Sequence, residues 1–164
     1  FSNKRYFTKE PERGDVIVFK TPADNRTDYI KRLIGLPGDT FQIIDTNLYL
    51  NNKKILRNKL ENSFNINCGN EILKIDAFEE TLPNGKKYIA VYRNETTMQN
   101  TDKFIVPDDH YFFMGDNRDN SKDSRYSDPG FVSDDYLVGT ATKIWFNWDF
   151  ENTPNWNRVW QTIE

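Results

Sequence analysis

A lysine and an arginine stand inside a run of apolar and β-branched residues in the segment DYIKRLIGLPGD, residues 28–39. Lys31 in such a strand is either a surface residue whose stem reaches toward solvent or a desolvated amine that works as a base. A free lysine, with a pKa of about 10.4, is protonated at neutral pH and accepts no proton. Apolar neighbours such as Ile30, Leu33 and Ile34 would lower that pKa, because burial disfavours the charged form. The rest of the chain has to decide between these alternatives.

A second polar stretch, GDNRDNSKDSR at residues 115–125, follows directly on the strand-like HYFFM. Its short side chains hydrogen-bond backbone groups as readily as water, which favours a tight, ordered loop. A solvated turn and a calcium loop are the alternatives. The calcium pattern fits poorly, because Arg118 takes the third position from Asp116 and Ser121 stands where an EF-hand has glycine. A metal site is therefore disfavoured.

Four stretches of the chain, taken in their order along the sequence, resemble bacterial type I signal peptidases. They are RGDVIVF, YIKRLIGLPGD, VPDDHYFFMGDNRDNSKDSR and GFVSDDYLVGTATKIW. Type I signal peptidases are membrane-anchored serine proteases of family S26 that remove signal peptides from exported proteins. The resemblance covers about residues 1–44 and 104–150. A lysine before a PGD turn is a weak signal alone, whereas the two motifs together are specific. The family uses a Ser/Lys dyad, and the resemblance makes Lys31 its general base.

The resemblance also implies roles for residues around this base. Strand alternation sends Lys31 and Arg32 to opposite faces, so Arg32 needs an anion of its own, and the resemblance pairs it with Asp116. Ser121 matches the residue that orients the lysine amine. Asp123 and Arg125 match a pair that supports the same segment, and Asp39 is expected to cap its turn. Tyr29 and Ile30 are implied to line the substrate pockets, and ordinary core packing is the alternative for these two.

The nucleophilic serine of the family belongs to a Ser-Met-x-Pro-Thr motif upstream of the RGD strand, and no serine of this chain has that context. We therefore expect the serine, part of the oxyanion hole and the membrane anchor to precede Phe1, and residues 1–164 alone to be inactive. The implied substrate is a signal-peptide-bearing preprotein, whose extended end adds beside an exposed strand. The resemblance implies small residues before the cut, and it implies no cofactor and no metal. It places the enzyme at the bacterial cytoplasmic (inner) membrane, with its catalytic domain on the periplasmic side.

Large amphipathic rings accumulate near the C-terminus. The four tryptophans of the chain all lie there: Trp145, Trp148, Trp156 and Trp160. Core packing is one interpretation. The family resemblance favours a second, in which some of these rings insert at the membrane interface close to the substrate.

Composition limits the remaining classes of function. A mean hydropathy of -0.80 leaves no segment apolar enough to span a bilayer. A net charge of -3 without a Lys/Arg block argues against a nucleic-acid partner.

Period-two patterns and Gly/Pro/Asn turns predict a mostly β fold. The resemblance implies that this is the signal-peptidase-like (LexA-like) β fold. Predicted turns lie at Pro37-Gly38, Asn51-Asn52 and Pro83-Asn84-Gly85, and the Asn-rich residues 56–71 are expected to form a loop. The last predicted strand covers residues 136–148. We expect a catalytic core, residues 1–44 and 104–164, interrupted by a hairpin-rich insertion, residues 45–103. One continuous β fold with long hairpins remains the alternative.

Two other functions compete with a signal peptidase. A self-cleaving Ser/Lys protease of the LexA-like type shares the chemistry, but the 115–125 loop and the long insertion argue against it. A non-catalytic β module that binds peptide or calcium through that loop belongs to a different class. It predicts an exposed Lys31 and a convergence of Asp116, Asp119 and Asp123 on one ion.

Overall fold

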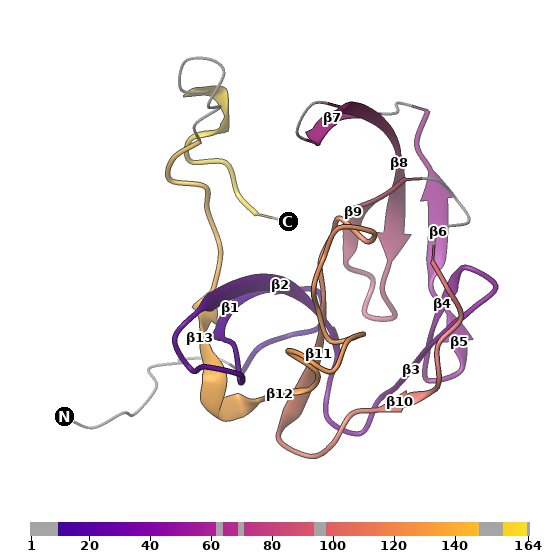
Figure 1. Cartoon of the computed structure of the whole chain (residues 1–164), viewed down its shortest axis with the longest axis vertical. Helices are drawn as coiled ribbons and strands as arrows, with labels where there is room; N and C mark the ends of the chain where they lie inside the picture. The colour runs from indigo at the N-terminus through magenta and orange to yellow at the C-terminus, as the bar shows by residue number, and fades with distance from the viewer. Residues whose placement is uncertain (1–9, 62–63, 69–70, 94–97, 148–155, 164) are drawn as a thin grey trace.

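The computed structural model describes residues 10–61, 64–68, 71–93, 98–147 and 156–163. Within these ranges the chain is built almost entirely from antiparallel β-strands (Figure 1), and its helical parts are two short 3-10 turns, η1 (Asp134–Tyr136) and η2 (Trp156–Arg158). The predicted mostly β fold is therefore confirmed.

A five-stranded antiparallel sheet is built from the two ends of the sequence, with the order β12-β11-β2-β1-β13. β-Branched and aromatic residues favour these strands, as in VIVFK, where burial alternates along the strand and Ile17 and Phe19 point into the core. The strands are β1 (Val16–Lys20), β2 (Asp28–Gly35), β11 (His110–Met114), β12 (Val132–Ser133) and β13 (Leu137–Thr140).

Two smaller sheets pack beside the first and consist mainly of hairpins from the middle of the chain. One has the order β10-β3-β4-β5, with β3 (Thr40–Ile44), β4 (Asn47–Leu50), β5 (Lys53–Lys54) and β10 (Phe104–Ile105). In the other, the long strand β8 pairs with all its neighbours; its strands are β6 (Leu56–Lys59), β7 (Phe64–Cys68), β8 (Glu71–Thr81) and β9 (Lys87–Tyr92).

The predicted turns are confirmed, and their backbone angles explain the residues used. Gly38 has φ +80, as the third position of a type II turn after proline requires. Asn51 and Asn52 both have positive φ, 51 and 61, at the tip of the β4–β5 hairpin. Gly85 has φ +85 between β8 and β9.

Two predictions about elements are wrong. The described part of residues 56–71 is not a loop, because β6 and β7 both pair with β8. The FNINC of β7 alternates apolar residues with Asn, which is a strand pattern despite the low strand propensity of Asn. The last predicted strand, residues 136–148, ends early: β13 stops at Thr140, and the chain then leaves the five-stranded sheet.

Two apolar clusters hold the sheets together. The smaller lies within the five-stranded sheet and contains Ile17, Phe19, Leu33, Phe113, Val132 and Leu137. The larger joins the three sheets and includes residues from both predicted ranges, such as Ile34 and Phe112 from the core and Phe78 and Tyr92 from the insertion. The predicted insertion therefore shares its apolar core with the flanking segments, and its boundaries stay a prediction.

After β13 the chain forms an arm that stands away from the five-stranded sheet (Figure 1). Its two described parts, residues 141–147 and 156–163, pair with each other. The amide of Ile144 lies 2.9 Å from the carbonyl oxygen of Gln161, and that of Ile163 lies 3.0 Å from the carbonyl oxygen of Thr142. Within the described ranges, no helix has the length and apolarity to cross a bilayer.

Candidate active site

Lys31 lies in the middle of β2, opposite Ile17 of β1. Its neighbour Arg32 is buried, as expected for residues that point to opposite faces of the strand. Leu33, two residues on, belongs to the smaller apolar cluster, so Lys31 emerges on the face of the sheet that this cluster covers.

The surroundings of the Lys31 amine are partly apolar, and the side chain is half-buried. Its Nζ lies 5.5 Å from the centroid of the Tyr29 ring. Desolvation lowers the pKa of the Lys31 amine from its ordinary 10.5; the carboxylates of Asp123 and Asp116 oppose this change, and the Arg125 guanidinium adds to it. The structure therefore favours a larger neutral fraction of this amine than a free lysine has.

The predicted apolar neighbours of Lys31 are only partly correct. Strand alternation places Leu33 on its face but Ile30 and Ile34 on the other. Ile34 is buried in the larger cluster, and Ile30 is 54% exposed. The expectation that these two residues desolvate the amine is therefore wrong.

Ser121 lies beside Lys31, and Gly115 makes the approach possible. A Cβ placed on Gly115 would stand 2.1 Å from Ser121 Oγ and 3.7 Å from Lys31 Cδ. Among the described residues, Ser121 Oγ is buried and has no hydrogen-bond partner. The implied bond from this hydroxyl to the lysine amine is therefore not formed here, although catalytic hydrogen bonds are often long without substrate.

Arg32 and Asp116 form the ion pair that the sequence predicts. Arg32 Nε lies 2.9 Å from Oδ1 of Asp116 and Nη2 lies 2.8 Å from Oδ2, a bidentate geometry. The guanidinium also donates to the carbonyl oxygen of Gly14 and lies 4.5 Å from the ring centroid of Tyr88. Because the pair joins β2 to the start of the 115–125 loop, it links the two sequence motifs directly.

A second ion pair lies inside the loop. Asp123 is fully buried, and its carboxylate accepts hydrogen bonds from Nε and Nη2 of Arg125, both at 2.8 Å. The same carboxylate accepts the amide hydrogen of Gly115 at 2.9 Å. Asp123 therefore holds the end of β11 and the returning loop together beside Lys31.

Asp39 caps its turn as the sequence predicts. Its carboxylate accepts from the Leu36 amide at 2.7 Å and from Asn51 Nδ2 at 2.7 Å, and it pairs with Arg13 at 2.7 Å. These hydrogen bonds lower the pKa of Asp39 against the opposing effect of burial. Its contacts are those of a structural residue.

The N-terminal half of β2 is open along one side. β1 pairs with Asp28–Arg32, whereas β11 pairs with β2 from Gly35 only as far as Arg32. Among the described strands, none therefore pairs with Tyr29, Ile30 and Lys31 on the side of β11. Tyr29 packs partly against the smaller apolar cluster, so core packing accounts for some of its contacts, whereas Ile30 is exposed.

The acids of the loop have separate partners. Asp116 binds Arg32, Asp123 binds Arg125, and a carboxylate oxygen of Asp119 accepts from the Arg93 amide at 2.7 Å. Over the part of the chain that the structure describes, no group of three or more His, Cys, Asp or Glu side chains is placed to hold a metal ion. The convergence of carboxylates that the calcium alternative requires is therefore not found there.

Sequence reasoning missed a buried network beneath the loop. Arg118 binds Glu80 of β8, and the hydroxyls of Tyr88 and Tyr92 of β9 contact both. The available signal was weak: β9 places two tyrosines on its buried face, and β8 places an acid on its own. Buried phenols and carboxylates need partners, but the sequence does not say which arginine supplies them.

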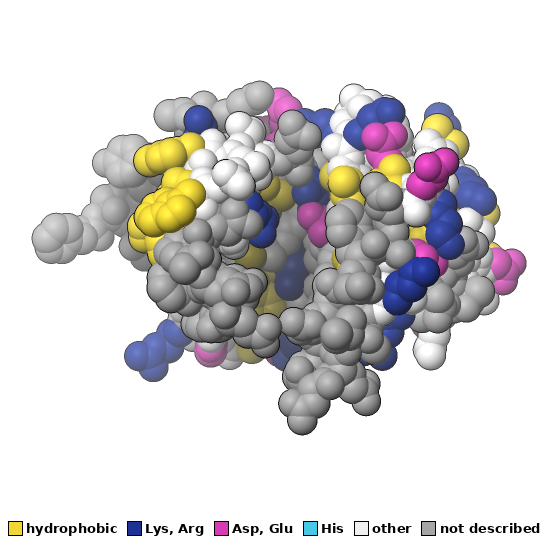
Figure 2. All heavy atoms as spheres, turned by 90° about the horizontal axis from the view of Figure 1, so that it is seen from above, with side chains coloured by type: hydrophobic (Ala, Val, Ile, Leu, Met, Phe, Trp, Pro, Cys, Tyr) yellow, Lys and Arg dark blue, Asp and Glu magenta, His cyan; other side chains and the backbone are white. Residues whose placement is uncertain are grey.

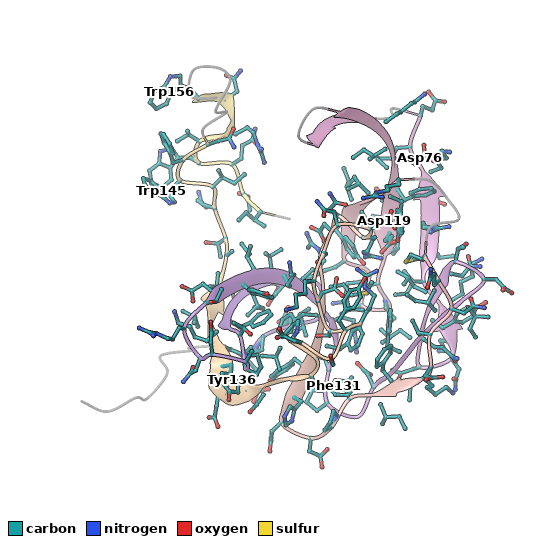
Figure 3. The ribbon with its side chains drawn as sticks, in the orientation of Figure 1. Asp76, Asp119, Phe131, Tyr136, Trp145 and Trp156 are labelled. Carbon is teal, nitrogen blue, oxygen red and sulfur yellow. The ribbon has the colours of Figure 1, made fainter. Side chains whose placement is uncertain are left out.

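The aromatic side chains of the arm are exposed rather than packed in a core. Trp145 is 76% exposed, and Trp156 and Trp160 are each 69% exposed; Trp148 lies outside the described residues. Figure 3 shows Trp145 and Trp156 on the same arm, away from the sheets. In Figure 2 hydrophobic side chains gather on the side of the molecule where Figure 1 places the arm.

Comparisons with known proteins agree with these motifs. The family model described as signal peptidase, peptidase S26, matches residues 1–148. The chain is 45% identical over 151 residues to a protein named signal peptidase I from Rickettsia typhi, and 46% identical over 151 residues to one from Rickettsia canadensis. Each match covers 87% of this chain and 55% of the relative, so the chain spans about half the length of these relatives.

One solved structure is also similar. A signal peptidase I from Enterococcus faecalis is 32% identical, with a TM-score of 0.48, and the match covers 82% of this chain and 98% of that one.

Proposed function

The chain belongs to the signal peptidase family, peptidase S26, and from this membership we propose that the protein is a serine endopeptidase that removes signal peptides from exported preproteins. One observation carries the proposal: the half-buried Lys31 side chain, whose amine has a lowered pKa, approaches Gly115, as Ser121 does, and the amine is influenced by the charges of two ion pairs.

In the proposed mechanism, the neutral Lys31 amine takes the proton from a serine hydroxyl as that hydroxyl attacks the scissile carbonyl. A lysine performs this step near neutral pH only when its surroundings lower its pKa. Ser121 is proposed to orient the amine through a hydrogen bond that forms when substrate binds, and its buried Oγ argues against a role as the nucleophile. Asp116, Arg32, Asp123, Arg125 and Asp39 support the two motif segments.

Substrate is proposed to bind along the open side of β2. An extended peptide there would add hydrogen bonds to the backbone of Tyr29 and Ile30, as in other cases of β-strand addition. Its alternate side chains would face shallow pockets beside Tyr29 and Ile30. The proposed preference for small residues before the cut comes from the resemblance to the family.

The test uses the full-length protein and a purified preprotein. Wild type is expected to cut the preprotein once, after a small residue, and Lys31→Ala is expected to reduce the rate by at least about 10³-fold. Lys53→Ala, which removes an exposed lysine of β5, is the matched control and is expected to retain the wild-type rate. Undiminished cleavage by Lys31→Ala would rule the proposal out.

We also propose that the arm contacts a membrane, and that the enzyme works at the outer side of the bacterial cytoplasmic membrane. Three largely exposed tryptophans on one arm are the support, because indole rings favour the lipid headgroup region. The net charge of -3 gives no electrostatic attraction to anionic lipid, so binding would depend on these rings.

Lipid vesicles test the contact. Neutral vesicles are expected to shift the tryptophan emission of the protein to shorter wavelength. The double variant Trp145→Ala/Trp156→Ala is expected to partition into these vesicles several-fold more weakly. Leu56→Ala, which removes an apolar side chain of similar exposure (65%) from β6, is the control. Unchanged partitioning of the double variant would contradict the proposed contact.

A further inference from the structure

A fully buried ion pair connects the predicted insertion to the polar loop. Glu80 of β8 and Arg118 of the loop are 0% exposed in their side chains, and they bind through two contacts, 2.6 Å from Nη2 to Oε2 and 3.0 Å from Nη1 to Oε1. Figure 3 shows the loop at Asp119, the next residue, lying against the β8–β9 hairpin.

Two tyrosine hydroxyls complete the pair. Tyr88 donates to Oε2 of Glu80 at 2.6 Å and accepts from Nη2 of Arg118 at 2.8 Å. Tyr92 donates to the other carboxylate oxygen and accepts from Nη1 at 2.8 Å. Burial raises the pKa of both tyrosines, so they remain protonated donors. Burial alone would lower the pKa of Arg118, but Glu80 and the tyrosines hold it well above its usual range, and the guanidinium stays charged.

The same arginine fixes the backbone of the loop. Its Nε donates to the carbonyl oxygen of Gly115 at 3.2 Å, and its own carbonyl oxygen accepts from Arg125 Nη2 at 2.6 Å. The loop is also joined to β9 by backbone bonds: Arg118 N to Val91 O at 3.0 Å, and Val91 N to Asp116 O at 2.8 Å. Arg118 therefore contacts both ends of the segment that carries Ser121.

From Arg118 the contacts continue to the amine. Arg125 binds Asp123, Asp123 accepts from the amide of Gly115, and Gly115 lies against both Ser121 and Lys31. The charged and titratable groups that face Lys31 are those of Asp123, Arg125 and Asp116, together with the ring of Tyr29. Three of these groups belong to the segment that Arg118 holds.

We propose that Glu80 and Arg118 are positioning residues for Lys31, an inference that rests on the proposed function of that lysine. A buried ion pair adds little net stability over an apolar pair of similar volume, but it fixes geometry through directed bonds. Here the Glu80–Arg118 pair fixes the 115–125 loop against β8, and the position of the loop sets its distance from Lys31 on β2. The predicted insertion thus contributes to the site through Glu80, although the charged groups that act on the amine, those of Asp123, Arg125 and Asp116, all belong to the loop.

The experiment compares Glu80→Gln with the double variant Glu80→Leu/Arg118→Met in the full-length protein. Glu80→Gln leaves a buried guanidinium unpaired, so it is expected to lower Tm as well as activity. The double variant removes both charges and is expected to recover part of the lost Tm, because the buried hydroxyls of Tyr88 and Tyr92 still lose these partners, and it is not expected to restore the position of the loop. We expect both variants to lower kcat by about 10- to 100-fold with KM within about twofold. Glu79→Gln, at an exposed pair on the same strand, is the matched control.

The pH dependence separates positioning from plain stability. A loosened loop lets water reach the amine, so the acid limb of kcat/KM is expected to move to higher pH in both variants. Recovery of wild-type kcat and of the wild-type limb by the double variant would overturn the proposal, and so would a lower activity with an unmoved limb.

A chemical measurement keeps this inference distinct from the proposed function. The rate at which an acylating reagent labels the Lys31 amine, followed by mass spectrometry across a pH series, reports its protonation without any cleavage. If wild type fails to cut a preprotein, the proposed function falls, and the labelling still decides the positioning role. A labelling profile that moves to higher pH in both variants supports the proposal, and an unchanged profile refutes it.

Discussion

Arg32 binds Asp116 through both carboxylate oxygens, at 2.9 and 2.8 Å, across 84 positions of sequence. The two partners differ in exposure: the Arg32 side chain is 5% exposed and that of Asp116 is 40% exposed. Removal of either partner therefore has a different effect on stability. If Asp116 is removed, the buried Arg32 guanidinium cannot bind water in its place, whereas an exposed Asp116 without Arg32 can.

Asp116→Ala should therefore destabilise the fold. The substitution removes the anion that pairs with the buried Arg32 guanidinium, which keeps its hydrogen bond to the carbonyl oxygen of Gly14. We expect the free energy of unfolding to fall by about 2–4 kcal/mol. Glu79→Ala breaks an exposed pair of equal length, 2.8 Å, and should cost less than about 1 kcal/mol. Chemical denaturation measures both, and equal losses would contradict the account.

Gly115→Ala tests the close approach of Ser121 to Lys31. The new methyl would lie 2.1 Å from Ser121 Oγ and 2.5 Å from its Cβ, so Ser121 must move from its place beside Gly115. We expect kcat/KM to fall by about 10²-fold or more. Gly139→Ala in β13 is the control, because nothing lies within 4 Å of its added methyl. A Gly115→Ala protein with normal activity would show that this contact is not needed.

Lys31 should also give the fold a pH dependence of stability. Its pKa is lowered in the folded state, so between the folded value and the unfolded value of 10.5 the unfolded chain binds more protons. Stability must then rise with pH across that window, by at most about 1.4 kcal/mol per pH unit. Below the folded pKa both states are protonated, and the cost of the buried charge is constant.

Lys31→Met removes this contribution. Below the pKa of Lys31 in the folded state, the Lys31→Met variant should be more stable than wild type by the largest margin. This difference in unfolding free energy should shrink as the pH rises toward 10.5. Parallel curves for the two proteins throughout that window would show that the amine is not desolvated.

Local signals explain what the sequence predicted well. The turns at Gly38, Asn51-Asn52 and Gly85 depend on positive φ, which is a property of the residues themselves. The Arg32–Asp116 pair followed from strand alternation together with a family motif. The roles assigned to Ser121, Tyr29 and Ile30 stay predictions.

Long-range partners explain what it missed. β7, with the sequence FNINC, has a period-two pattern, but Asn has a low strand propensity, and pairing with β8 supplies the hydrogen bonds of the strand. Glu80 and Arg118 are 38 positions apart, and neither has a local pattern that identifies the other. Ile30 is next to Lys31 in the sequence but does not surround its amine, because a strand sends adjacent side chains to opposite faces.

The most direct test of the central claim is the pH dependence of kcat/KM for preprotein cleavage by the full-length protein. A neutral Lys31 amine as the base predicts an acid limb with a pKa below the ordinary lysine value of 10.5, and no cleavage by Lys31→Arg, whose guanidinium does not lose its proton. An active Lys31→Arg protein, or a limb at or above 10.5, would contradict the account.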